Sequence, residues 1–242
     1  MKTLRSVFGS DGGLRAAALV CLMAALGANQ AAAVTDENPY PAMSPIGQYR
    51  MTTADEIALA KSAAPAPVAE HAEVLVLGEQ GYETAVNGTN GFVCWVGRAW
   101  DMGFDNPEFW NPKIRAPECD NAVMARSVDP HFLTRTTWVL AGVSKAEMQQ
   151  REAAAWASGK YQAPEPGAMS YMLAKGGYIT DAAGHWHPHV MFLTPRSDDA
   201  AWGANLPGSP VAADSINIEK TSIFMVIVGN WSDGTPAPFH SH

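Results

Sequence analysis

The sequence has few cysteines, few basic residues and no long apolar run, and each shortage excludes a class of protein. Three of the 242 residues are cysteine, and they form neither a C-x-x-C redox motif nor the paired spacing of a zinc finger. Lys and Arg number 16 against 24 Asp and Glu, which gives a formal net charge of −8. Because no basic cluster offsets this charge, the surface suits neither nucleic acid nor anionic lipid.

Common hydrolase motifs are missing as well. The sequence contains neither the G-x-S-x-G turn of a serine hydrolase nor the H-E-x-x-H helix of a zinc peptidase. After the N-terminal region no segment approaches 18 consecutive apolar residues. We therefore expect a soluble mature protein with no membrane span and no nucleic-acid partner.

The N-terminus predicts an export signal. Positively charged residues precede an apolar run at 16–28, which is too short to span a bilayer. Ala31 and Ala33 are the small residues of an A-x-A cleavage site, so we expect residues 1–33 to be a signal peptide. A lipoprotein signal at Cys21 is a weaker interpretation, because a valine precedes that cysteine where a small residue is expected.

Export would leave an acidic chain with two cysteines. Removal of residues 1–33 takes away three basic residues and one acidic residue, leaving 209 residues and a net charge of −10. The periplasm and the extracellular medium, the two expected locations, are oxidising, so we expect Cys94 and Cys119 to form a disulfide. Such a bridge would close a loop of about 25 residues and contribute roughly 3 kcal/mol to stability.

The order of strand and helix patterns predicts an α+β fold. We expect a single compact domain at 53–236, built mainly from an antiparallel sheet with two or three helices and long loops. An extended arm at 34–52 precedes it and a flexible tail at 237–242 follows. The first three strands indicate a meander. The expected strands are 72–77, 83–86, 92–100, 168–174, 190–195 and 221–229, and the expected helices are 52–64, 121–142 with a break near Pro130, and 144–159.

Two of these helices carry start signals. Thr53 and Glu56 match a capping box, in which side chains satisfy the first free backbone N–H groups. Ser144 and Glu147 match a second capping box, and Gly159 lies where a C-terminal glycine belongs. We expect the helix at 144–159 to rest its apolar face on the sheet, with these side chains buried: Met148, Ala155 and Trp156.

Six short stretches give the chain a distinctive set of motifs: GTNGFVCWV, FWNPKI, PGAMSYML, GHWHPHVMF, WGANLPGSPV and NWSDGT. In these motifs the chain resembles a group of uncharacterised exported bacterial proteins, over roughly residues 53–236. The resemblance implies export and one compact unit. The group has no known activity, so the resemblance implies no catalytic or binding residue.

The stretch GHWHPHVMFLTP places three histidines at alternate positions. In a strand, His185, His187, His189 and Met191 would share one face, with successive members about 6.6 Å apart. Pro188 cannot donate to a sheet ladder, so we expect a core strand to begin near it, with His187 and His189 on one face at its entry.

This residue set suits a transition metal. Imidazole is a good ligand for Zn and Cu, and a thioether favours Cu, so the sequence predicts Cu or Zn as the cofactor. The predicted ligands are His185, His187, His189 and Met191. Protonated imidazole cannot bind a metal, so we expect affinity to fall as the pH drops through about 6.

Structural interpretations of the same residues stay open. His185 and His187 can be turn residues, and His189 can be a hydrogen-bonded core histidine. His240 and His242 could add ligands from the tail. The methionines after residue 33 are interpreted first as core packing. They include Met169, Met172, Met191 and Met225.

Other residues leave further alternatives. Asp129 and His131, in SVDPHF, could join the histidines in a metallopeptidase, although their context predicts a turn before a helix. Tryptophans in loop-like regions could line a groove for sugars or apolar molecules, or could fill gaps in a loop-rich domain. They are Trp95, Trp100, Trp110, Trp186, Trp202 and Trp231.

Three functional hypotheses follow from these residues. The first is a non-enzymatic binding module that holds a transition metal at His185, His187 and His189. The second is a metal-dependent hydrolase that uses the same histidines. The third is a purely structural or interaction protein of the cell envelope. The expected partner is a small molecule or an envelope component.

Export is directly testable. If residues 1–33 are removed after an A-x-A site, N-terminal sequencing of the protein from its host cells should begin near Val34. Protein that retains Met1 and stays in the cytoplasm would contradict the prediction.

Overall fold

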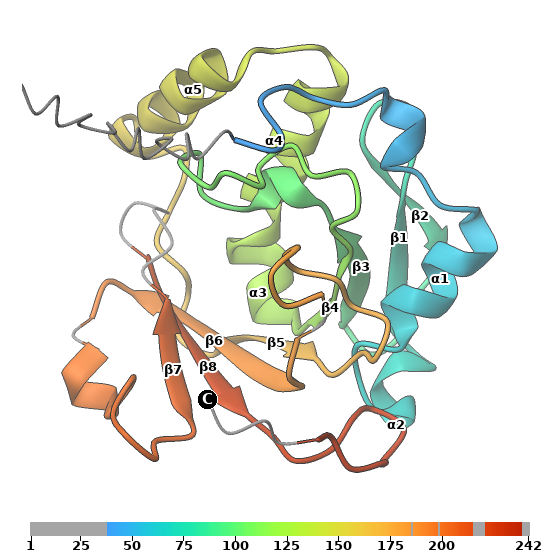
Figure 1. Cartoon of the computed structure of the whole chain (residues 1–242), viewed down its shortest axis with the longest axis vertical. Coiled ribbons are helices and arrows are strands. Elements are labelled where there is room, and N and C mark those ends of the chain that lie inside the picture. Colours follow the sequence, from blue (N-terminus) through green and yellow to red (C-terminus); the bar gives the residue numbers. More distant parts are fainter. Residues whose placement is uncertain (1–37, 185, 198, 215–220, 239–242) are drawn as a thin grey trace, which may run out of the picture. The chain divides into compact units, whose positions relative to one another are not determined.

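The computed structural model describes residues 38–184, 186–197, 199–214 and 221–238. The expected signal peptide, His185 and the tail histidines lie outside these ranges. The described residues form an α+β fold with one eight-stranded, mainly antiparallel sheet in the order β2-β1-β3-β4-β5-β6-β8-β7 (Figure 1). The strands are β1 (Glu73–Leu77), β2 (Tyr82–Val86), β3 (Val93–Gly97), β4 (Ala116–Asp120), β5 (Ala168–Met172), β6 (His189–Pro195), β7 (Val211–Asp214) and β8 (Thr221–Ile227).

Five α-helices accompany the sheet in this part of the chain, three of them of nine residues or more. None of the described helices is long and apolar enough to cross a membrane. The α-helices are α1 (Thr53–Lys61), α2 (Ala66–Ala69), α3 (Ala122–Ser127), α4 (Asp129–Leu140) and α5 (Lys145–Ala157), and the short 3₁₀ helices are η1 (Ile46–Gln48), η2 (Ala99–Asp101) and η3 (Asp199–Trp202).

The first three strands do not form the predicted meander. Strand β1 lies between β2 and β3, and it pairs with β3 in parallel through Glu73–Val93 and Val74–Cys94. The chain then returns along β4, which is antiparallel to β3 over five residue pairs. Strand β4 is not among the strands expected from the sequence, because APECD contains a proline and two acids, residue types that are rare in strands.

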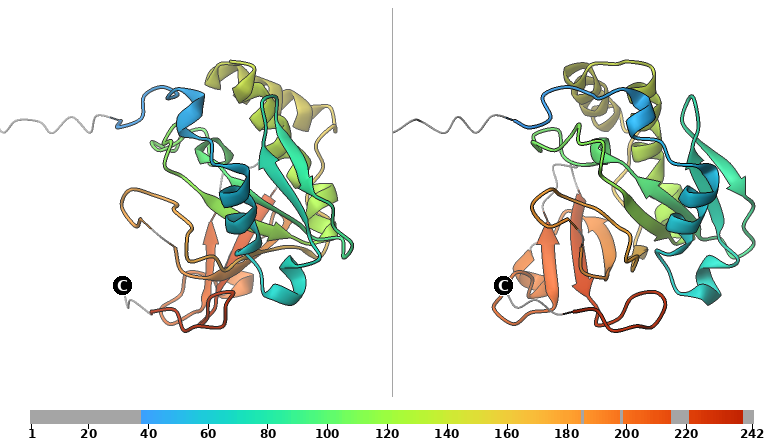
Figure 2. Two further views of the ribbon diagram at one scale, coloured as in Figure 1. Left: turned by 90° about the vertical axis from the view of Figure 1, so that its right-hand side faces the viewer. Right: turned by 45° about the vertical axis from the view of Figure 1, so that its right-hand side comes forward.

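Helices cover both faces of the first half of the sheet. Helix α1 packs on β1, β3 and β4, whereas α3 packs on β4 and β5, and α4 contacts β2. The rotated views show α1 and α3 on opposite sides of the strands (Figure 2). Strands β6, β8 and β7 continue the sheet beyond these helices, and side chains on the α3 face of β5, β6 and β8 line a cavity.

The N-cap of helix α1 lies one residue before the predicted N-cap. The N-cap is Thr52, whose side chain accepts a hydrogen bond from the backbone N–H of Asp55. The predicted partner Glu56 is instead buried and pairs with Arg98, with Arg98 Nη2 and Glu56 Oε1 2.7 Å apart. The capping prediction at Thr53 was therefore wrong by one position, because two adjacent threonines and two adjacent acids offer the same spacing.

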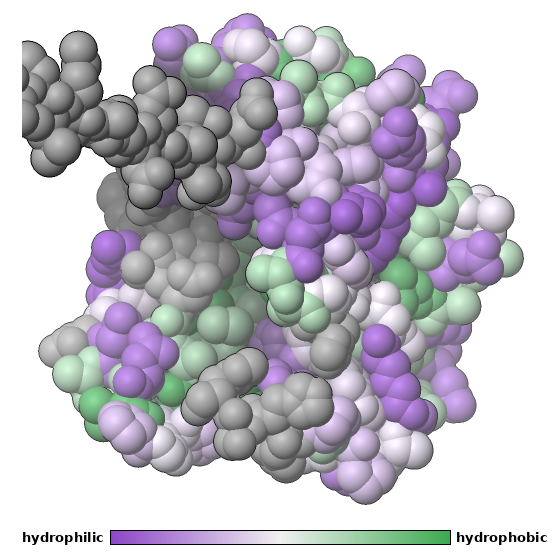
Figure 3. All heavy atoms as spheres, viewed as in Figure 1, coloured by the Kyte–Doolittle hydropathy of each residue, from purple (hydrophilic) through white to green (hydrophobic). Residues whose placement is uncertain are grey.

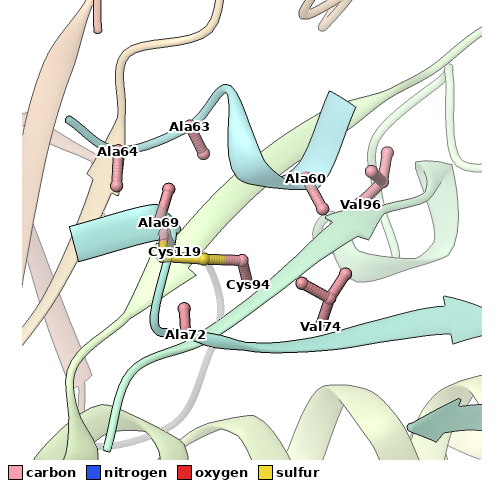
Figure 4. Packing of buried hydrophobic residues seen from close by; sticks show 9 residues of the cluster. All are labelled: Ala60, Ala63, Ala64, Ala69, Ala72, Val74, Cys94, Val96 and Cys119. Atoms are coloured by element: carbon pink, nitrogen blue, oxygen red, sulfur yellow. A yellow bond between two sulfur atoms is a disulfide. The ribbon is translucent and has the colours of Figure 1, made fainter. Parts of the chain in front are cut away.

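Small side chains allow α1 to lie close to the sheet over the disulfide. Cys94 on β3 and Cys119 on β4 are direct cross-strand partners, and their Cα atoms are 3.9 Å apart, which confirms the predicted bridge. Alanines from α1, α2 and the adjoining turns surround it (Figure 4). The buried members of this cluster are Ala60, Ala63, Ala64, Ala69, Ala72, Val74, Cys94, Val96 and Cys119.

Helix α5 has the predicted start, end and buried face but a different neighbour. The Ser144 side chain accepts from the N–H of Glu147, and Gly159 follows the helix with φ of 75°. Met148, Ala155 and Trp156 are buried as expected. The helix lies against α4 instead of the sheet (Figure 1), through the ion pair Arg135–Glu152 and ring contact between His131 and Trp156. Helix α4 already occupies that side.

The segment before α1 contributes to the core. Tyr49 is fully buried, and its ring contacts Trp100 with 5.0 Å between centroids. Its hydroxyl donates to the carbonyl of Trp110 at 2.7 Å. This segment, expected to be an extended arm, therefore supports the residues around η2.

The disulfide should stabilise the fold measurably. Replacing both cysteines (Cys94→Ala with Cys119→Ala) frees a 25-residue loop in the unfolded chain, so the free energy of unfolding should fall by about 3 kcal/mol. Urea denaturation of the protein and the double variant measures this difference. The prediction would be contradicted by equal unfolding free energies for the two proteins, or by two free thiols in the unsubstituted protein after unfolding.

Candidate functional site

The predicted histidine site is divided by the start of strand β6. The strand begins at His189, and His187 precedes it in irregular backbone. His185 lies outside the described residues. His189 and Met191 are on one face of the strand, as predicted, and both line the same cavity.

The imidazole of His189 is held in one orientation. The side chain is 5% exposed, and its Nδ1 lies 2.7 Å from the carbonyl oxygen of His187. Because a carbonyl only accepts hydrogen bonds, Nδ1 carries the hydrogen and Nε2 of the neutral ring keeps its lone pair. Burial lowers the pKa of His189, which favours this neutral ring.

Trp186 packs against His189. Its ring meets that of His189 edge to face at 5.6 Å, and its indole N–H donates to the carbonyl of Ala174 at 3.0 Å. The backbone of Gly177 lies directly against the indole, where an added Cβ would come within 2.6 Å of a ring carbon. Trp186 is therefore locked in place beside the imidazole, and only glycine fits at position 177.

A cavity of about 150 Å³ lies beside His189, well above the ~15 Å³ that a single water needs. Apolar side chains form most of its wall, and in the space-filling view such side chains gather near the middle of the face, in the region of β6, β8 and α3 (Figure 3). Four ionisable residues also line it: Arg98, Asp101, Glu118 and His189. Five methionines complete the set: Met102, Met124, Met172, Met191 and Met225.

Strand register brings three of these methionines next to His189. Met172 of β5 is the direct cross-strand partner of His189, and Met225 of β8 is the direct partner of Met191. Directly opposed residues have Cβ atoms about 4.5–5.5 Å apart. One imidazole and three thioethers from three adjacent strands therefore face one space. From the sequence, Met172 and Met225 are expected only as core residues, because strand pairing cannot be read from local sequence.

A group of buried carboxyls lies on the same face of β4. Glu118 and Asp120 are both buried, and Asp129 at the start of α4 is buried beside Asp120. The indole N–H of Trp95 donates to Asp120 Oδ2 at 2.7 Å. A side-chain hydrogen bond joins Asp129 to Asp120, and such a bond requires one of the two carboxyls to be protonated. If β4 had been predicted as a strand, the alternation of side chains would have placed Glu118 and Asp120 on one face and Cys119 on the other.

Burial changes the charge of this group. It raises the pKa of Asp120 to about 7, and likewise that of Asp101 at the cavity wall. The pKa values of Glu118 and Asp129 are raised well above their ordinary range, by burial first and then by the neighbouring charge of Asp120. The raised pKa values favour the protonated, neutral form of Glu118 and Asp129, which is the form that an apolar interior tolerates.

The other candidate residues lie elsewhere. His131 stacks on Tyr161 with 4.0 Å between centroids, and burial lowers its pKa to about 4. His131 lines a second cavity, beside Arg126, which is separate from the cavity beside His189. Trp95, Trp100 and Trp186 are buried with their indole N–H groups bonded to protein acceptors. These three fill the core and do not line a groove.

Within the described ranges, no group of three or more His, Cys, Asp or Glu side chains lies close enough together to hold a metal ion. Comparisons with protein-family models, characterised proteins and solved structures gave no match.

The buried acids predict an unusual dependence of stability on pH. Burial raises the pKa of Asp120 to about 7 in the folded protein, whereas the unfolded chain already releases this proton at about pH 4. The contribution of Asp120 to the free energy of unfolding is therefore fully present below about pH 4 and is lost as the pH rises to about 7. Asp120→Asn keeps an acceptor for Trp95 and removes the ionisation. At about 1.4 kcal/mol per unit, the variant should gain on the order of 2–4 kcal/mol over the native protein between pH 4 and pH 8.

Urea denaturation at a series of pH values measures this gain. Glu79→Gln, at an exposed carboxyl in the turn between β1 and β2, is the matched control and should show no such gain. If the free energy of unfolding of Asp120→Asn differed from that of the native protein by the same amount at every pH, the raised pKa of Asp120 would be contradicted.

Proposed function

We propose that the protein is a non-enzymatic binding module that holds a transition metal ion in the cavity beside His189. The observation that carries the proposal is the buried imidazole at the cavity wall, with Nδ1 bonded to a backbone carbonyl and Nε2 left with its lone pair. Metal-binding histidines usually donate their second ring N–H to a carbonyl or carboxylate, which fixes the ring for the metal.

The surroundings of His189 support binding over hydrolysis. A metal-dependent hydrolase needs an open position for water and a base beside the metal. The wall here is mainly apolar, and burial raises the pKa of the lining carboxyl Glu118 well above its ordinary range, which favours the protonated form that cannot act as a base. Among the described lining residues, none carries a hydroxyl or thiol nucleophile.

Export to the periplasm or the medium is part of the proposal. The Cys94–Cys119 disulfide supports it, because such bridges persist in oxidising compartments. The partner we propose is therefore an ion or small molecule met outside the cytoplasm.

Metal titration tests the proposal. The purified protein, with His240→Ala and His242→Ala to remove tail ligands, is titrated by calorimetry with Zn(II) and, without oxygen, with Cu(I). We expect saturable binding of at least one of these ions. His189→Gln removes the imidazole nitrogen, so it should lower the affinity by about 100-fold or more.

His71→Ala is the matched control. It removes an exposed imidazole that lies between α2 and β1 and does not line the cavity, so affinity should change little. Binding that survives His189→Gln unchanged, or absence of binding to either ion, would contradict the proposed function.

A further inference from the structure

Four soft or borderline donors form a continuous patch on the cavity face of the sheet. His189 and Met191 follow each other on that face of β6, Met172 lies opposite His189, and Met225 lies opposite Met191. All four side chains line the same cavity. On β8, Phe224 turns to the other face and stacks on Trp202, so the alternation leaves Met225 on the cavity side.

Core packing alone does not account for this arrangement. Flexible methionines usually fill irregular gaps in a protein. Here five of the nine methionines that follow residue 33 line a pocket of about 150 Å³ that they leave unfilled. Side chains able to fill a gap thus line a pocket instead.

The donor chemistry selects the ion. Thioethers are soft, uncharged ligands that favour Cu(I), whereas Zn(II) sites in proteins are built from thiolate, imidazole and carboxylate groups. Neutral ligands in an apolar enclosure also suit a monovalent ion better than a divalent one, because less charge has to be removed from water. The buried imidazole adds a borderline donor with a fixed direction.

We propose that Met172, Met191 and Met225, together with His189, form a binding site specific for Cu(I). This inference rests on the proposed function and deepens it: it adds Met172 and Met225 as ligands and names the ion. His187 acts in the site through its carbonyl oxygen, which orients the imidazole.

Competition with a chromophoric Cu(I) chelator tests the site. The protein with alanine at positions 240 and 242 is titrated without oxygen, with ascorbate to keep the copper reduced. Met172→Leu, Met191→Leu and Met225→Leu conserve volume and remove the sulfur, and each should lower Cu(I) affinity by about tenfold or more. Zn(II) affinity should be weaker than Cu(I) affinity and should not respond to these changes.

Met169→Leu is the matched control. Met169 lies on β5 with Met172 but on the opposite strand face, so Cu(I) affinity should stay unchanged. Circular dichroism confirms folding of every variant, and Met225→Leu, at a less buried position, preserves the test if Met172→Leu fails to fold. Thiol labelling after each titration confirms that Cys94 and Cys119 are still bridged and supply no thiolate.

The outcomes separate the two proposals. Loss of Cu(I) affinity in the three leucine variants, with Met169→Leu unchanged, supports the thioether site. Metal binding that depends on His189 but not on the methionines overturns the Cu(I) site and leaves the proposed function standing. If neither ion binds, both are overturned.

Discussion

The buried guanidinium of Arg98 holds together the segments that shape the cavity. Its side chain pairs with Glu56 of α1 and donates to the carbonyls of Tyr49 and Val96, while its backbone N–H donates to Asp101. Removing one partner from such a buried pair typically costs about 3–5 kcal/mol, because the other charge is left without compensation. The N-terminal segment, α1, β3 and η2 therefore depend on one residue, and that residue also lines the cavity.

The two halves of the sheet are stabilised by different means, and the cavity lies where they meet. Strands β1 to β4 carry the disulfide and the buried acids of β4, and the Arg98–Glu56 pair joins the end of β3 to helix α1. Strands β5, β6 and β8 contribute Met172, Met191, Leu193, Ile223 and Met225 to the cavity wall. Charged groups neutralised by pairing or protonation thus form one side of the space, and adaptable apolar groups form the other. A ligand that fits this boundary must tolerate an apolar surface and need few charged contacts.

Local sequence predicted the elements that have strong local patterns. It did not predict the features that depend on pairing between strands distant in the sequence. Helix α5 follows from its caps and period, the disulfide from the two remaining cysteines, and β8 from a long apolar run. Strand β4 could not be recognised, because Glu118 and Asp120 are acceptable in a buried strand only when protonated. The parallel contact of β1 with β3 likewise has no local signal.

The candidate site was predicted only in part for the same reason. Alternation placed His189 and Met191 on one face, but β6 starts at His189, so His187 contributes a carbonyl in the structure. Met172 and Met225 lie 17 and 36 positions from His189 in the sequence, and only the register of β5, β6 and β8 brings them together.

X-ray absorption at the copper K-edge tests the proposed Cu(I) site without any substitution, because it identifies the atoms bound to the ion. For the protein loaded with Cu(I) and with its disulfide intact, we expect a sulfur shell from the thioethers together with an imidazole nitrogen. A spectrum that contains only nitrogen and oxygen neighbours would contradict the claim that this methionine-lined cavity is a copper site.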